Sequence, residues 1–133
     1  MAFVVDNSIV VAWLIESQAT PYTRRLSVRA KREALHAPGV WPLEFVNTLW
    51  AMQKRRLLRP GQADALVAKA ARLAIVVDME PVALPSMLGL VRNTMLSSYD
   101  ASYLELATRR GLPLATRDAS LARAARAAGV LLS

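Results

Sequence analysis

Acidic side chains occupy four positions where an α/β protein can gather them at one site. Asp6 directly follows the apolar, β-prone run at residues 3–5, and Asp118 lies just past a second such run. Asp100 stands near the start of one expected helix, and Glu44 lies in the first turns of another. Ligands of open parallel α/β sheets bind at the carboxyl ends of the strands. We therefore expect these four acids to converge on that edge of the sheet.

Four carboxylates in one place repel one another and need a counterion if all are to stay ionised. Mg²⁺ or Mn²⁺ suits this role, because hard cations choose carboxylate oxygens and keep several waters. One bound ion can polarise a phosphate and lower the pKa of a water, and two ions about 4 Å apart can also stabilise a leaving oxygen. The predicted chemistry is metal-dependent hydrolysis of a phosphate ester.

Each acid also has an ordinary structural explanation. Asp6 and Asp118 could simply cap the helices that follow them. Asp100 could be a plain acid at a helix N-terminus, and Glu44 could complement the positive end of its helix dipole. The hypothesis therefore rests on the joint placement of the four residues and not on any one of them.

The charge balance of the chain favours a polyanionic partner. The sequence has 17 Lys and Arg residues against 10 Asp and Glu residues, which gives a net charge of +7. A basic surface favours nucleic acid, although an arginine-rich surface of an ordinary soluble domain explains the charge equally well. An acidic pocket that holds cations within a basic protein suits phosphodiester cleavage, because the arginines can hold the nucleic-acid backbone.

Length and composition predict a single domain over residues 1–133. Hydrophobic residues make up 54% of the chain, enough for a substantial core, and the absence of cysteine excludes disulfides and thiolate metal sites. The lone His36 has no second His or Cys to complete a ligand set. The N-terminus lacks the basic region of a signal peptide, and the apolar run at residues 9–15 is far shorter than the roughly 20 residues of a membrane helix. We expect a cytoplasmic protein.

Strand and helix patterns alternate along the chain, and no hairpin turn separates two strands. Asn7 or Ser8 is expected to cap the first helix, and Gly111 is expected to end a later one. This alternation predicts an α/β fold, a three-layer α/β/α sandwich with a mainly parallel central sheet. The expected strands cover residues 3–5, 35–37, 75–77, 113–116 and 130–132, and the expected helices cover residues 9–16, 20–34, 41–52, 62–73, 84–95, 98–110 and 119–128.

The residues around the four acids form blocks in a particular order. The blocks are Val4-Val5-Asp6-Asn7-Ser8, Pro42-Leu43-Glu44-Phe45-Val46-Asn47-Thr48-Leu49, Tyr99-Asp100-Ala101-Ser102-Tyr103-Leu104-Glu105-Leu106-Ala107 and Leu114-Ala115-Thr116-Arg117-Asp118. In this order and spacing the sequence resembles the PIN-domain nucleases and, more narrowly, the VapC toxins of bacterial type II toxin–antitoxin pairs. The resemblance spans almost the whole chain.

The resemblance implies a PIN-like α/β/α fold, dependence on Mg²⁺ or Mn²⁺, and endoribonuclease activity that inhibits translation. It also implies a homodimer and a cognate VapB-like antitoxin that inserts a segment near the active site. Carried over by position, Asp6, Glu44, Asp100 and Asp118 match the acidic quartet of the family.

Three polar residues match further positions of the family pattern. Ser8 matches a frequent hydroxyl residue two positions after the first Asp, Thr116 a hydroxyl residue two positions before the last acid, and Asn47 an Asn in a Glu-x-x-Asn block. Such residues can orient carboxylates or water, although each could also be a helix cap. Asn7 departs from the family, where Thr or Ala is common, and we expect little consequence because its side chain need not bind metal.

Two other kinds of protein compete with a nuclease. A phosphatase of the haloacid-dehalogenase kind would need an Asp where Ser8 stands, and a receiver-like phosphoacceptor domain would need a Lys where Arg117 is a poor substitute. A non-catalytic module could bind RNA or protein through the basic helices alone. The complete acid quartet argues against that module.

Overall fold

The computed structural model describes residues 1–133, and its centre is a parallel sheet of four strands. The strands are β1 (Ala2–Val5), β2 (Ala34–Pro38), β3 (Val76–Asp78) and β4 (Leu114–Ala115). Their order in the sheet is β3-β2-β1-β4, and every pairing is parallel. The chain adds strands in one direction from β1 to β3 and then crosses to the other side of β1. The strand order therefore reverses between β1 and β4, which is where open α/β sheets bind ligands.

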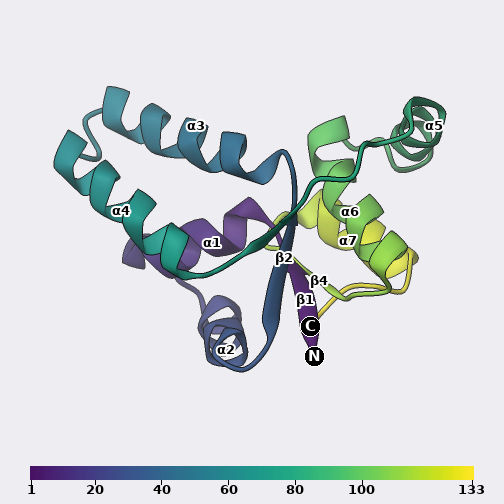
Figure 1. Cartoon of the computed structure of the whole chain (residues 1–133), viewed down its shortest axis with the longest axis horizontal. Coiled ribbons are helices and arrows are strands. Elements are labelled where there is room, and N and C mark those ends of the chain that lie inside the picture. The colour runs from purple at the N-terminus through teal and green to yellow at the C-terminus, as the bar shows by residue number, and fades with distance from the viewer.

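Helices cover both faces of this sheet and make the predicted three layers. In Figure 1, α5, α6 and α7 lie to the right of the strands and α1 to α4 lie to the left. The helices are α1 (Asn7–Leu14), α2 (Pro21–Ala30), α3 (Trp41–Lys54), α4 (Pro60–Arg72), α5 (Leu84–Thr94), α6 (Ser98–Arg110) and α7 (Ala119–Ala127), with a short 3₁₀ turn, η1 (Glu16–Gln18). None of these helices combines the length and the apolar composition that a membrane span requires.

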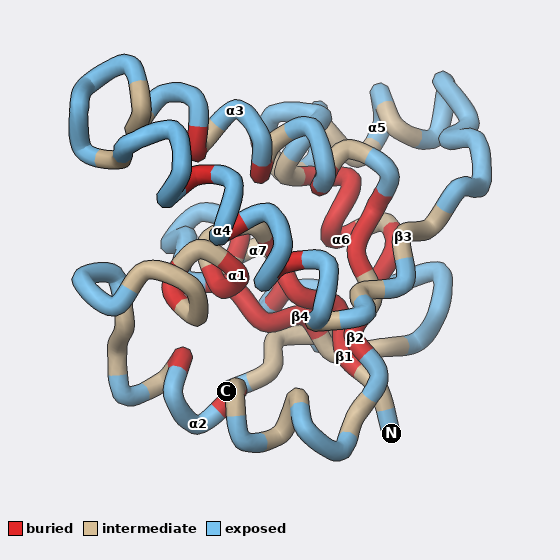
Figure 2. The backbone as a smooth tube through the Cα atoms, turned by 60° about the vertical axis from the view of Figure 1, so that its left-hand side comes forward, coloured by how far each residue is buried: buried red, intermediate tan, exposed pale blue.

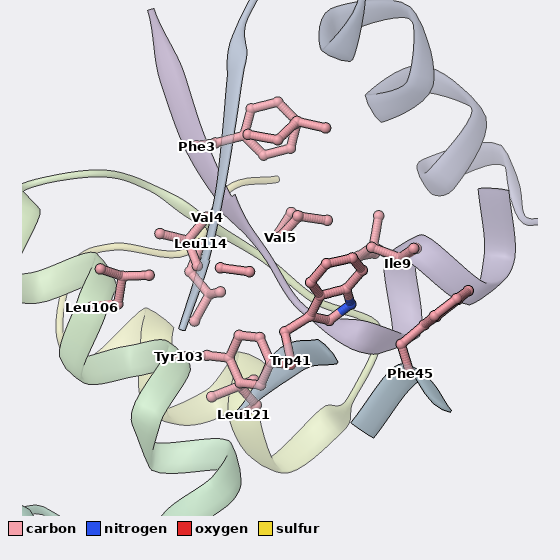
Figure 3. Close-up of a cluster of buried hydrophobic side chains, with 14 of the residues drawn as sticks. Phe3, Val4, Val5, Ile9, Trp41, Phe45, Tyr103, Leu106, Leu114 and Leu121 are labelled. Carbon is pink, nitrogen blue, oxygen red and sulfur yellow. The ribbon is translucent and has the colours of Figure 1, made fainter. Parts of the chain in front are cut away.

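The hydrophobic core surrounds β1 and α6. Phe3, Val4 and Val5 are fully buried, as expected for a central parallel strand covered on both faces. Buried segments concentrate in β1, β2, β4, α1 and α6, whereas α3, α4 and α5 are largely exposed (Figure 2). Figure 3 shows the core side chains, among them Tyr103 of α6 and Leu121 of α7. Asp6, which follows β1, and the first residues of α6 are therefore attached to tightly packed segments.

Helix caps fix the acids at the ends of the strands. Asp6 caps α1 by accepting a hydrogen bond from the backbone N–H of Ile9, so the expectation that Asn7 or Ser8 is the cap was wrong. The reason is that β1 ends at Val5, which leaves Asp6 as the residue in extended conformation before the first helical turn. Asp118 caps α7 by accepting from the Leu121 N–H.

The other elements follow the sequence patterns closely, with two departures. The helix expected over residues 20–34 ends at Ala30, because Ala34 already pairs with Ala2 in the sheet. The strand expected over residues 130–132 is reduced to a single bridge between Leu131 and Leu114. Gly111 ends α6 in the left-handed conformation, as predicted.

Candidate active site

A pocket of about 310 Å³ lies where the strand order reverses, at the carboxyl ends of β1 and β4. Its walls also include residues from the first turns of α1, α3 and α6. The structure brings all four predicted acids into this pocket: Asp6, Glu44, Asp100 and Asp118. We refer to these four residues as the pocket acids.

Asp6 is the most constrained of the pocket acids. Only 5% of the residue is exposed. Its Oδ1 accepts hydrogen bonds from the Ser8 hydroxyl at 2.6 Å and from the Ile9 N–H at 3.2 Å, and its Oδ2 accepts one from the Thr116 hydroxyl. Ser8 and Thr116, the two hydroxyl residues of the motif blocks, therefore donate to different oxygens of the Asp6 carboxylate.

The same two hydroxyls connect Asp6 to the end of β4. The Ser8 Oγ accepts a hydrogen bond from the backbone N–H of Arg117 at 3.0 Å, and the Thr116 Oγ1 accepts one from the N–H of Asp118 at 3.0 Å. This network ties the end of β1 to the segment that carries the last acid. The relative positions of Asp6 and Asp118 are thus set by hydrogen bonds as well as by strand pairing.

Burial and mutual repulsion raise the pKa of three pocket acids, Asp6, Glu44 and Asp100. Burial raises the pKa of Asp6 to about 6, despite its three hydrogen bonds, and Asp100 adds to the shift. Burial also raises the pKa of Glu44, against the opposing hydrogen bond from Tyr103, and Asp100 again contributes. The pKa of Asp100 itself is raised by burial and then by Asp118. Asp100 is therefore the common electrostatic neighbour of the other three.

The donor chemistry of the pocket fits a divalent cation. All four acids offer hard carboxylate oxygens, and none of them forms an ion pair with a Lys or Arg side chain. No three acidic side chains stand close enough together to make a full protein ligand cluster. Mg²⁺ binds in this manner in many proteins, through one or two carboxylates with waters and substrate phosphates completing its shell.

Asn47 is a predicted site residue that the structure does not bring to the pocket. It lies on the exposed side of α3 and makes no side-chain hydrogen bond, whereas its neighbour Thr48 lines the pocket. A helix turns about 100° per residue, so the residue four positions after Glu44 stays closer to its face than the residue three positions after it. From this part of α3 the structure therefore brings Glu44 and Thr48 to the pocket, and not Asn47.

Several pocket residues were missed by sequence reasoning or given no role. Tyr103 donates its hydroxyl hydrogen bond to Glu44 Oε1 at 2.6 Å, and Asn7 donates its amide hydrogen bond to Thr48 Oγ1 at 3.0 Å. Arg117 and Gln18 also line the pocket. All of these residues except Gln18 lie inside a motif block that contains an acid, so the sequence carried a signal for each of them.

Comparisons with known proteins identify the family of this chain. The model of the PIN domain family matches residues 3–127. "Ribonuclease VapC3" of Mycobacterium tuberculosis is 34% identical over 125 residues, which cover 91% of this chain and 85% of that protein. "Ribonuclease VapC3" of Pyrobaculum aerophilum is 28% identical over 124 residues, with 92% and 93% covered.

A solved structure supports the fold independently. The crystal structure of PAE2754 from Pyrobaculum aerophilum superposes with a TM-score of 0.69 and covers 92% of this chain and 84% of that one, at 24% sequence identity. The family match, the relatives and the fold all agree with the resemblance drawn from the motif blocks. The chain therefore belongs to the PIN-domain family and to its VapC-type branch.

Proposed function

We propose that this protein is a metal-dependent endoribonuclease that acts as the toxin of a VapBC-type toxin–antitoxin pair and inhibits translation by cutting RNA. The observation that carries the proposal is the convergence of four carboxylates without cationic partners in one pocket at the switch point of the sheet. Two relatives of similar length that bear the name ribonuclease support the choice of RNA.

The residues of the pocket have different roles in this proposal. Ser8, Thr116 and the Ile9 N–H hold the Asp6 carboxylate in one orientation, so that it need not reorganise when a ligand arrives. Asp100 concentrates negative charge between the other acids. Mg²⁺ or Mn²⁺, held by one or two of the pocket acids together with waters, would supply the charge that polarises a phosphate and activates a water.

Basic side chains on the surface bind the RNA backbone in this proposal. Arg117 lines the pocket, and its guanidinium forms no ion pair. The exposed cations at the end of α3 and beyond, Lys54, Arg55 and Arg56, form none either. Free cations that neutralise phosphates supply most of the sequence-independent affinity for nucleic acid.

Protein partners complete the proposal. We propose a homodimer in the cytoplasm, held inactive by a VapB-like antitoxin. Large exposed apolar side chains support protein contacts, because such patches are uncommon on proteins that act alone. They occur on α3 and α4 at Val46, Trp50 and Val67, and on α5 at Leu84 and Leu88.

The test compares two Asp→Asn variants in RNA cleavage. Wild-type protein is incubated with total cellular RNA and Mg²⁺, with and without EDTA, beside Asp100→Asn and the control Asp64→Asn. Asp64 is exposed on α4 and forms no ion pair. Wild type and Asp64→Asn should cut RNA, EDTA should stop both, and Asp100→Asn should be slower by about 100-fold or more.

Other outcomes would assign a different activity. Full cleavage by Asp100→Asn, or cleavage that survives EDTA, would remove the proposed mechanism. RNA binding without cleavage of any RNA would favour the non-catalytic module. For the toxin role, induced wild-type protein should stop growth and amino-acid incorporation, and induced Asp100→Asn should not.

A further inference from the structure

Glu44 differs from the other pocket acids in the way it is held. Asp6 and Asp118 cap the helices that follow them, and Asp100 lies in the first turn of α6, which packs on β1. Glu44 lies on α3, which packs against α1 and α4 and forms with α4 an arm that extends away from the strands (Figure 1). The place of Glu44 therefore depends on how this arm is attached to the rest of the molecule.

Tyr103 forms the first attachment at the pocket. Its residue is 1% exposed, and its ring belongs to the core cluster beside α7 (Figure 3). Its hydroxyl donates a hydrogen bond to Glu44 Oε1 at 2.6 Å, and no other donor reaches the Glu44 carboxylate. A ring packed in a dense core has little freedom. The hydroxyl thus presents one fixed donor to a carboxylate on a separate element.

Asn7 and Thr48 form the second attachment. The Asn7 side-chain amide donates to Thr48 Oγ1 at 3.0 Å, and the Thr48 hydroxyl donates to the backbone carbonyl of Glu44 at 3.0 Å. Asn7 is the first residue of α1 and follows Asp6 directly. The backbone of Glu44 is therefore tied to the segment that carries the first acid, and its carboxylate is tied to the helix that carries Asp100.

We infer that Tyr103, together with the Asn7–Thr48 pair, positions Glu44 so that one carboxylate oxygen is fixed while Oε2, which receives no hydrogen bond, remains available to a divalent cation. Tyr103 is a positioning residue in this scheme and acts only through Glu44. The inference rests on the proposed metal-dependent function. It also gives a role to Asn7, the position at which the chain departs from its family pattern.

The experiment compares two Tyr→Phe variants of the full-length protein. Mn²⁺ binding is measured by isothermal titration calorimetry without RNA, and the melting temperature of each metal-free protein is recorded first. Tyr103→Phe removes the hydroxyl that reaches Glu44, whereas Tyr99→Phe makes the same change at a 62% exposed residue of the same helix. Tyr103→Phe should weaken Mn²⁺ binding by about 10-fold or more, as loss of such orienting partners does elsewhere. Tyr99→Phe should keep wild-type affinity.

A double-mutant cycle of Tyr103→Phe and Glu44→Gln separates the positioning role of Tyr103 from a general structural role. Tyr103→Phe should cause no further loss of Mn²⁺ affinity in the Glu44→Gln background, because its only route to the cation is then missing. An equal loss in both backgrounds would overturn the inference, as would wild-type affinity in Tyr103→Phe. If Tyr103→Phe does not fold, Thr48→Val decides: weaker Mn²⁺ binding is expected, and unchanged binding overturns the inference.

The readout also separates this inference from the proposed function. If the wild type binds Mn²⁺ but cuts no RNA, the proposed function fails, and the affinity of Tyr103→Phe still decides the positioning role. If RNA cleavage is metal-dependent and Tyr103→Phe binds Mn²⁺ as the wild type does, the positioning role alone fails. A wild type that binds no Mn²⁺ overturns both.

Discussion

The tripeptide Val-Val-Asp occurs twice in this chain and has two different fates. In the first copy it ends β1 and leads to Asp6, and in the second it forms β3 and ends at Asp78. Both acids stand at the carboxyl ends of strands of one parallel sheet, in which β2 separates β1 from β3. Asp6 has no cationic partner, whereas Asp78 forms ion pairs with Arg109 at 2.6 Å and with Arg110 at 3.0 Å. The same tripeptide thus ends in an acid without a cationic partner at one site and in an ion-paired acid at the other.

The second environment is a saturated ion-pair cluster. Arg109 also pairs with Glu80 at 2.9 Å and with Glu105 at 2.7 Å, so that one guanidinium engages three carboxylates. We refer to Arg109, Arg110, Asp78, Glu80 and Glu105 as the Arg109 cluster. The hydrogen bond from Arg109 lowers the pKa of Asp78, while burial raises the pKa of Asp6. Paired acids stabilise a fold, whereas buried acids without a counterion destabilise it and mark a place for a ligand.

Replacing Asp6 or Asp78 by asparagine should give the largest difference between the two sites, in the rate of RNA cleavage. Asp6→Asn should lower RNA cleavage by about 1,000-fold, equivalent to about 4 kcal/mol of transition-state stabilisation. Asp78→Asn makes the same chemical change in the Arg109 cluster and should leave cleavage within a few-fold of wild type at temperatures where it is folded. Both rates are measured by single-turnover cleavage of one RNA. Equal losses in the two variants would contradict the division into a functional and a structural group.

The pH dependence of stability should have opposite signs at the two sites. The pKa of Asp6 is raised in the folded protein from 3.8 to about 6, so folding favours its protonated form. Its contribution is full below pH 4 and is lost as the pH rises through 6, by about 3 kcal/mol in the metal-free protein. The pKa of Asp78 is lowered, so its contribution is present above its ordinary pKa and is lost as the pH falls.

Urea unfolding of metal-free protein between pH 3 and pH 8 checks both signs. Asp6→Asn should remove the decline in the free energy of unfolding between pH 4 and pH 6, and Asp78→Asn should flatten the acid side of the profile. If Asp6→Asn keeps the wild-type decline, Asp6 is not the group responsible. Added Mn²⁺ should restore stability above pH 6 in the wild type and not in Asp6→Asn.

Removal of Arg109 should destabilise the fold without touching the pocket. The Asp78 side chain is only 6% exposed, and Arg109→Ala would leave it with Arg110 alone. Because the Arg109 side chain is 28% exposed, solvent screens part of the loss, and we expect about 2 kcal/mol. Arg126→Ala removes an exposed arginine that forms no ion pair and should change the free energy of unfolding by less than about 0.5 kcal/mol. Equal effects in urea would show that the Arg109 cluster contributes nothing specific.

The sequence allowed much of this arrangement to be predicted, for reasons that are local. A strand-to-helix transition at Asp6, a glycine stop at Gly111 and alternating patterns depend on residues close together in the chain. The motif blocks around the acids depend on the same short range. These features gave the parallel three-layer fold and the acids that the structure brings to one pocket.

What could not be predicted depends on contacts between distant segments. Tyr103 and Glu44 are 59 positions apart, and Arg109 and Asp78 are 31 apart. The Val-Val-Asp tripeptide itself does not predict that Asp78 is paired, because its partners are arginines at the end of α6. The choice of Thr48 over Asn47 has a similar origin, since the docking of α3 decides which side chain meets Asn7.

Arg117 extends the comparison from acids to cations and gives the smallest expected effect. Arg109 is saturated by three carboxylates, whereas Arg117 lines a pocket with four and pairs with none. Its backbone N–H bonds to Ser8, which bonds to Asp6, so the residue is fixed relative to the site. We therefore expect its guanidinium to bind an RNA phosphate next to the cut.

RNA binding by the inactive Asp100→Asn protein, measured over a range of salt concentrations, checks this role. Adding Arg117→Ala should weaken binding a few-fold and reduce the slope of log affinity against log salt by about 1, as loss of one phosphate contact does. Arg126→Ala is the matched control, because it lies eight positions after Asp118, about 12 Å along α7. It should change the slope less. An unchanged slope in Arg117→Ala would mean that this cation does not contact an RNA phosphate and only moderates the negative charge of the pocket.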